Sequence, residues 1–175
     1  MLETPIETAR LRIRRFAPAD WAAVYAYASD SAVMAWIPDG PMTEAQAREF
    51  AADNAGPEAV ALAVVLKDAG RLIGTLAFHP WFAPRTWEIG WVFHPAYHGQ
   101  GYATEAARAL ADYAFAVVHI HRLIATCQPQ NPASWRVMEK LGMRREGYFQ
   151  QCIHREDGTW WDEYFYAVLE SEWGR

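Results

Sequence analysis

The sequence of 175 residues predicts an α+β fold with a mixed sheet in a single domain, residues 1–175. Apolar segments typical of strands recur along the chain, and segments with helical spacing lie between them. A strand, a helix and a second strand follow one another from Trp87 to Cys127. Because a helix joins these two strands, we expect them to be parallel and connected by a right-handed crossover.

The first half of the chain predicts a strand, two helices and three further strands. Residues 11–16 alternate between apolar and arginine side chains, which is typical of a strand. Thr43 to Gln46 match the capping-box pattern, so a helix is expected from there to about Asp53. The other expected elements are a helix opened by Pro18-Ala19-Asp20 with Trp21, Val24, Tyr25 and Ala28 on one face, strands at 60–66, 72–78 and 87–93, and an irregular aromatic loop at 79–84.

The second half predicts two helices and three strands. The helix from Gly101 to about Val118 carries alanines at helical spacing, which indicates close packing against a sheet. Asn131 and Pro132 have the residue types of a helix N-cap and first turn, and Gly142 is expected just beyond the end of that helix. The strands are expected at 122–127, 147–154 and 163–169, the last two flanking an Asp157-Gly158 turn.

Composition and charge exclude several classes of function. The formal net charge of −5 argues against nucleic-acid binding through a basic face, and it favours cationic substrates such as amines. With no long apolar run and no signal-peptide pattern at the N-terminus, we expect a cytoplasmic protein without a membrane span. Cys127 and Cys152 make no disulfide framework and are expected to be reduced and buried. No Cys/His cluster predicts a metal site.

The segment between the strand at 87–93 and the following helix predicts an anion site. Gly99 and Gly101 allow a sharp turn and a close approach of the backbone to a ligand. The free N–H groups at the start of a helix attract negative charge, which suits a phosphate. The spacing matches neither a Walker loop nor a dinucleotide fingerprint. The alternative interpretation is a turn that merely needs glycine.

This loop resembles the signature of the GNAT superfamily of N-acetyltransferases. His98-Gly99-Gln100-Gly101-Tyr102-Ala103 is similar to the family pattern Gln/Arg-x-x-Gly-x-Gly/Ala. The continuation to Thr104-Glu105-Ala106, Asn131-Pro132-Ala133-Ser134 and Glu139-Lys140-Leu141-Gly142-Met143 resembles the RimJ/RimL-like branch, which includes enzymes that acetylate ribosomal-protein N-termini. The resemblance covers essentially the whole chain. One position departs from the pattern: His98 stands where the family usually has Gln or Arg.

The resemblance implies a GNAT-like sheet of seven mostly antiparallel strands flanked by about four helices, with a splayed central parallel pair. It also implies acetyl-CoA as cosubstrate, an amine acceptor and, as a family expectation, a homodimer. The pyrophosphate would lie on the main-chain amides of Gln100 to Thr104, while Trp91 and Val92 would run beside the pantetheine arm. The expected coenzyme contacts are Trp91, Val92, His98, Gly99, Gln100, Gly101, Tyr102, Ala103, Thr104, Asn131 and Ser134.

Acetyl transfer to an amine needs a base for the amine and a hydrogen bond or proton for the leaving sulfur. Glu88, at the start of the strand before the loop, is the candidate base, with His79 and His94 as alternatives. Glu88 can also be interpreted as an ordinary carboxylate at the end of a strand. Ser134 is the candidate for the sulfur, and Asn131 for a coenzyme contact in addition to its capping role. The aromatic or polar residues expected around the acceptor are Trp36, His79, Trp81, Phe82, Trp87 and Tyr148, each of which also suits a core position.

Two classes of function remain after this reading of the sequence. The first is an enzyme that transfers acetyl from acetyl-CoA to a protein N-terminal amine or a small-molecule amine. The second is a non-catalytic module that binds acyl-CoA on the same scaffold. Such a module would tolerate the loss of Glu88 and Ser134, and both residues are present, which favours the enzyme.

Overall fold

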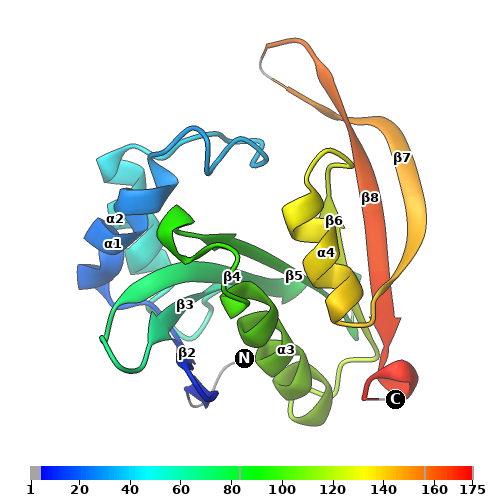
Figure 1. Ribbon diagram of the computed structural model, residues 1–175, viewed down its shortest axis with the longest axis horizontal. Helices are drawn as coiled ribbons and strands as arrows, with labels where there is room; N and C mark the ends of the chain where they lie inside the picture. Colours follow the sequence, from blue (N-terminus) through cyan, green and yellow to red (C-terminus); the bar gives the residue numbers. More distant parts are fainter. Residues whose placement is uncertain (1–4, 83, 156, 175) are drawn as a thin grey trace.

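The computed structural model describes residues 5–82, 84–155 and 157–174. Its eight strands form one sheet in the order β1-β2-β3-β4-β5-β6-β8-β7 (Figure 1). The strands are β1 (Ile6–Glu7), β2 (Leu11–Arg14), β3 (Ala61–Leu66), β4 (Leu72–Pro80), β5 (Thr86–Phe93), β6 (Arg122–Cys127), β7 (Arg144–His154) and β8 (Trp160–Leu169). The helices are α1 (Trp21–Ala28), α2 (Glu44–Asp53), α3 (Tyr102–Ala116) and α4 (Pro132–Lys140), with short 3-10 turns at Pro18–Asp20, Pro95–Tyr97 and Glu170–Glu172.

The sheet separates two hydrophobic clusters, because alternate residues of a strand point to opposite faces. In β3, Leu62 and Val64 pack with the buried face of α3, whereas Ala63 and Val65 pack with residues of α1 and α2. The predicted alanine face of α3 is confirmed. Its buried residues are Ala106, Ala107, Leu110, Ala111, Ala114 and Phe115.

Local sequence signals place the ends of two helices. The Thr43 hydroxyl accepts a hydrogen bond from the Gln46 amide, and the Gln46 side chain accepts one from the Thr43 amide, so the predicted capping box is confirmed. The Asn131 side chain accepts from the Ser134 amide at 3.3 Å and caps α4. Gly142 follows α4 with φ at +80°, as a residue just beyond a helix end often does.

The predicted splay between the parallel strands is confirmed. β5 and β6 pair in parallel only at Thr86–Arg122, Trp87–Leu123 and Glu88–Ile124. Beyond Glu88, β5 continues to Phe93 while it stays paired with β4 on its other edge. The edge of β5 that carries Trp91 and Val92 therefore faces a gap and not a neighbouring strand, which opens the sheet at its centre.

Several expectations needed correction. The sheet has eight strands and not seven, because β1 is a two-residue strand that is too short for an alternation to be recognised. On α1 the buried aromatic residue is Tyr27, while Tyr25 is exposed, since Val24, Tyr27 and Ala28 form the inward face. The expected loop at 79–84 begins later, because β4 runs through Pro80. Cys127 is buried as expected, but Cys152 is exposed on the edge strand β7.

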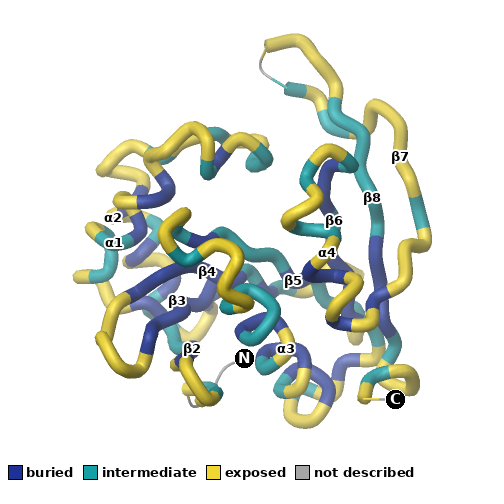
Figure 2. Tube along the Cα trace, in the orientation of Figure 1, coloured by how far each residue is buried: buried dark blue, intermediate teal, exposed yellow. Residues whose placement is uncertain are grey.

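In the last hairpin, both strands begin three residues earlier than predicted. β7 begins at Arg144 and β8 at Trp160. The register of the pair shifts between Phe149 and Ile153, and Gln151 adopts a positive φ of 48° there. The hairpin stands beyond the rest of the molecule, and most of β7 is exposed (Figure 2).

Candidate active site

A cleft of about 720 Å³ passes through the gap between β5 and β6. From the face of the sheet that packs on α3, it is lined by the loop at 97–99, the start of α3 and the start of α4. From the other face it is lined by residues between α1 and α2, together with Ile153 and Glu163 of the β7–β8 hairpin. The splay therefore joins two differently built surfaces, which we call the α3 end and the hairpin end of the cleft.

The α3 end presents main-chain donors. The amides of Tyr102, Ala103 and Thr104 open the helix, and no acceptor among the described residues takes them. Gly101, the N-cap, has φ at +81°, and Gly99 has φ at +74°, so both occupy the left-handed region that favours glycine. The positive end of the α3 dipole adds to these donors. The arrangement can bind an anion such as a phosphate.

Two side chains of this loop bond to the backbone of the segment before it. The His98 ring donates from Nε2 to the Phe93 carbonyl at 2.8 Å, and Gln100 donates from Nε2 to the Ala96 carbonyl at 2.9 Å. Both side chains therefore bond back to the segment that precedes them. His98, at the position that departs from the family pattern, closes the turn through a hydrogen bond to the backbone.

The N-terminal segment also anchors the start of α3. Arg10 donates to the Gln100 carbonyl at 3.1 Å and pairs with Glu105 at 2.6 Å, and the Thr8 hydroxyl donates to Glu105 at 2.6 Å. Burial alone would raise the pKa of Glu105, but the bonds from Thr8 and Arg10 lower it overall. Glu105 thus stays ionised beside the helix N-terminus, as expected for a first-turn acid. Arg10 and Thr8 were not predicted, since their contacts span the whole first half of the chain.

Asn131 and Ser134 line the same end of the cleft, as their predicted roles require. Asn131 uses its side-chain oxygen to cap α4, which leaves its amide nitrogen for another acceptor. The Ser134 hydroxyl has no hydrogen-bond partner among the described residues. Trp91 and Val92 complete this part of the lining from the free edge of β5.

Glu88 lies at the point where β5 and β6 separate. The Thr126 hydroxyl donates to its Oε1 at 3.2 Å, and His79 Nε2 lies 3.8 Å from its Oε2. Burial raises the pKa of Glu88, His79 and Thr126 oppose the rise, and the charge of Glu163 adds to it. Thr126 and Glu163 line the cleft, whereas Glu88 is not among its described lining residues.

Two alternatives to Glu88 occupy other places. His94 uses Nδ1 to accept from the Ala96 amide at 3.2 Å, which makes it a backbone-bonded loop residue. Cys127 lines the cleft, but burial, helped by the charge of Glu163, raises the pKa of its thiol to about 12. A thiol with that pKa is not ionised at neutral pH and is a poor nucleophile.

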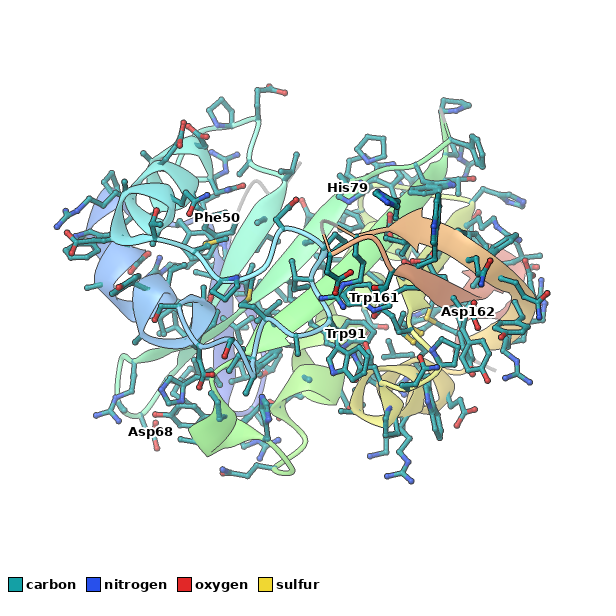
Figure 3. All side chains as sticks on the ribbon, turned by 90° about the horizontal axis from the view of Figure 1, so that it is seen from above. Phe50, Asp68, His79, Trp91, Trp161 and Asp162 are labelled. Carbon is teal, nitrogen blue, oxygen red and sulfur yellow. The ribbon has the colours of Figure 1, made fainter. Side chains whose placement is uncertain are left out.

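Of the residues expected around the acceptor amine, Trp36 lines the cleft. Its ring centroid lies 6.2 Å from that of Trp161. In Figure 3, Trp161 lies between His79 and Trp91. Trp87 stacks on Phe78 at 4.4 Å, and Tyr148 bonds to Asp162. His79, Trp81, Phe82, Trp87 and Tyr148 are not among the described lining residues.

Sequence reasoning missed most of the hairpin end. Its unpredicted lining residues come from separate segments of the chain, and only Glu163 carried a usable signal. It is an acid two residues from Trp161 and from Phe165, so it shares a face of β8 with two aromatic side chains. The other unpredicted lining residues include Ala32, Val33, Ile37, Pro38, Thr126, Gln128 and Ile153.

The match to known proteins agrees with this geometry. The model of the acetyltransferase (GNAT) domain family matches residues 10–144, which include the glycine loop and both α3 and α4. The chain belongs to the GNAT family of acetyltransferases. As a GNAT acetyltransferase it is an enzyme of a family that uses acetyl-CoA, and the eight-stranded mixed sheet is the fold of that family.

Relatives of this GNAT acetyltransferase include a protein of Bacillus subtilis (strain 168) named as the uncharacterized N-acetyltransferase YnaD. It is 52% identical over 168 residues, which are 96% of this chain and 98% of the relative. The crystal structure of an acetyltransferase (GNAT family) from Bacillus anthracis superposes with a TM-score of 0.93 at 51% identity and covers 97% of this chain and 100% of that one.

A third relative supports the branch predicted from the sequence. The [ribosomal protein uS5]-alanine N-acetyltransferase of Escherichia coli (strain K12) is 31% identical over 85 residues, 49% of this chain and 43% of the relative. The resemblance to the RimJ/RimL-like branch is thereby confirmed as a relationship of part of the chain.

No helix in residues 5–82, 84–155 and 157–174 combines the length and apolarity needed to cross a bilayer. Within the same residues, no group of three or more His, Cys, Asp or Glu side chains is placed to hold a metal ion.

Proposed function

We propose that this GNAT acetyltransferase transfers the acetyl group of acetyl-CoA to a primary amine by direct attack on the thioester. The observation that supports this most is the continuity of the cleft. Uncapped amides of α3 lie at one end, the free edge of β5 runs along the middle, and the carboxylate of Glu163 lies at the other end, with Glu88 behind Thr126.

The residues fit acetyl-CoA as a cosubstrate. The amides of Tyr102 to Thr104 would bind its pyrophosphate, and the free edge of β5 at Trp91 and Val92 would pair with the amides of the pantetheine arm. Asn131 would donate from its free amide nitrogen, and Ser134 would bond the leaving sulfur. When bound, acetyl-CoA supplies the activated acetyl group.

The protein's contribution at the hairpin end is proton transfer and binding of the acceptor. Glu88, with a pKa raised by burial, would accept the proton of the acceptor amine, directly or through water. An α-amine with a pKa near 8 is already about one-tenth neutral at pH 7, so the base need not be strongly perturbed. The acceptor is a protein N-terminus or a small amine.

Charge at the hairpin end favours an acceptor whose amine has no neighbouring carboxylate. Glu163 is the one charged residue there among the described lining residues, and the basic residues of the lining, Arg136 and Lys140, belong to α4. Lys140 lies beside α3, since its carbonyl accepts from Arg108. An acceptor carboxylate would therefore meet like charge and no cation.

An acceptor screen tests the proposed function. Purified protein, acetyl-CoA and a panel of primary amines, including phenethylamine, phenylalanine and short peptides with free N-termini, are incubated while free thiol is followed. We expect thiol release with at least one amine and phenethylamine to exceed phenylalanine. Binding of acetyl-CoA without any amine-dependent thiol release would instead support the alternative, a non-catalytic acyl-CoA-binding module.

A further inference from the structure

A second carboxylate, Glu163, lies near Glu88, and it is the one that lines the cleft. Glu163 of β8 lines the hairpin end directly, while Glu88 of β5 reaches it through Thr126 of β6. The alternation of β8 places Glu163 on the same face as Trp161, whose ring approaches Trp36. Three strands thus bring two carboxyl groups to one hydroxyl group at the point where the sheet splays.

The single hydroxyl limits how these three groups can bond. Thr126 donates to Glu88 at 3.2 Å. Thr126 pairs with Phe165 across β6 and β8, so Glu163, two residues before Phe165, lies on the same face of the sheet as Thr126. A hydroxyl has one proton to donate, so it can bond two carboxyl groups at once only if one of them is protonated and donates back. Because the two carboxyl groups lie around one hydroxyl group, Thr126 can serve both only when one of them carries a proton.

The surrounding charges agree with such a pair. His79 of β4 lies 3.8 Å from Glu88. Burial and, after it, the negative charge of Glu163 raise the pKa of the Cys127 and Cys152 thiols. Among the described residues, neither carboxylate has a lysine or arginine partner. Glu163 is thus a partly buried acid that faces the cleft without a cation of the protein beside it.

We propose that Glu163 is a further catalytic residue, which contacts the acceptor ammonium and takes its proton. Glu88, which lies behind Thr126, is then the second acid of the pair and acts on the amine through Glu163 and not directly. One N–H bond of the ammonium breaks, its electron pair stays on nitrogen, and the proton moves to a carboxylate oxygen of Glu163. The nitrogen lone pair then forms the C–N bond as the C–S bond breaks, and the electron pair of the C–S bond stays on sulfur. A second N–H bond of the nitrogen breaks, and its proton goes to the sulfur, which leaves an amide and a free thiol. Thr126 is a positioning residue.

This inference rests on the proposed acetyl transfer to an amine, so its test uses the amine that gives the largest thiol release in the screen. Glu163→Gln is compared with Glu170→Gln, which makes the same change at an exposed residue just past the end of β8. We expect Glu163→Gln to lower kcat/KM at pH 7 by about 100-fold and to recover at higher pH. Glu170→Gln should stay within about twofold of the wild type.

Thr126 provides the second comparison. Thr126→Ser keeps the hydroxyl and should retain most activity, whereas Thr126→Val keeps the shape and should lose about tenfold in kcat. Acetyl-CoA should raise the melting temperature of all these variants as it does for the wild type, which shows that each is folded and binds. Equal activity of Thr126→Val and Thr126→Ser would contradict the link between the two acids.

A titration without turnover completes the test. Carboxyl carbons of ¹³C-labelled glutamate are followed by NMR as the pH changes, in the wild type and in Glu163→Gln. Because the charge of Glu163 raises the pKa of Glu88, the Glu88 midpoint should move to lower pH in the variant. An unmoved midpoint, or Glu163→Gln activity equal to that of Glu170→Gln, would overturn the inference. A wild type inactive toward every amine would instead contradict the proposed function.

Discussion

At the α3 end of the cleft the ligand-facing groups are main-chain amides, whereas at the hairpin end they are side chains from separate strands. The amides of Tyr102 to Thr104 belong to one continuous loop and helix. The groups at the hairpin end come from β6, β8 and the segment between α1 and α2. The α3 end thus depends on backbone conformation and suits a constant ligand, while the hairpin end depends on side chains that can differ between relatives.

The largest expected effect is at the α3 end. Gly101→Val puts a β-branched residue at a φ of +81°, which such residues strongly disfavour, so the loop must change shape. With acetyl-CoA at about 100 times its Kd, the melting temperature of the wild type should rise on the order of 5–10 °C, and that rise should disappear in the variant. Thermal shift with and without acetyl-CoA measures it.

The control for Gly101→Val is Gly70→Val. Gly70 also has a positive φ, +59°, but it lies in the β3–β4 turn and not in the cleft lining. This variant should lose a similar amount of stability and keep the acetyl-CoA shift. If Gly101→Val kept the shift as well, the amides at the start of α3 would not be the coenzyme site.

The next effect concerns proton transfer. Glu88→Gln removes one acid of the proposed pair, so kcat/KM at pH 7 should fall by about 100-fold. Activity should recover as the pH approaches the pKa of the acceptor amine, because solvent then deprotonates it. The pH–rate profile is the measurement, and a loss of the same size at every pH would contradict a role as base.

A smaller effect is expected for the aromatic wall. Trp36→Ala removes a ring that lines the cleft and lies 6.2 Å from the ring of Trp161, so the KM for the amine should rise by about tenfold with the acetyl-CoA shift unchanged. Trp160→Ala, at an exposed position of the hairpin, is the matched control and should leave both constants unchanged. If Trp36→Ala changed only the rise in melting temperature caused by acetyl-CoA, Trp36 would belong to the coenzyme site and not to the acceptor site.

The smallest effect is on stability. Burial raises the pKa of Glu163 above the ordinary value of 4.5, so the folded state favours the protonated form. The stability that protonated Glu163 contributes is therefore complete below the ordinary pKa, and it is lost as the pH rises through the raised pKa of the folded state. Glu163→Gln should therefore melt about 2 °C above the wild type at pH 7 and together with it near pH 4. A wild type that is the more stable at pH 7 would contradict this.

The comparison of the two ends also explains what could be predicted. The elements around the glycine loop were predicted almost to the residue, because caps, glycines and the alanine face of α3 act within a few residues of one another. The missed features depend on distant contacts. β1 exists only because β2 pairs with it, and Arg10 reaches Glu105 only after β2 has docked beside α3.

The sequence by itself determined the family, the loop that presents free amides, and the helix that follows it, because φ preferences and helix termini are local properties of the backbone. The tertiary structure decided which acid faces the cleft. Glu88 and Glu163 both sit on predicted strands, and only the splay of β5 from β6, with the register of β8, brings Glu163 into the cleft and sets Glu88 behind Thr126. Strand pairing across the chain fixes that choice, and no local pattern encodes it.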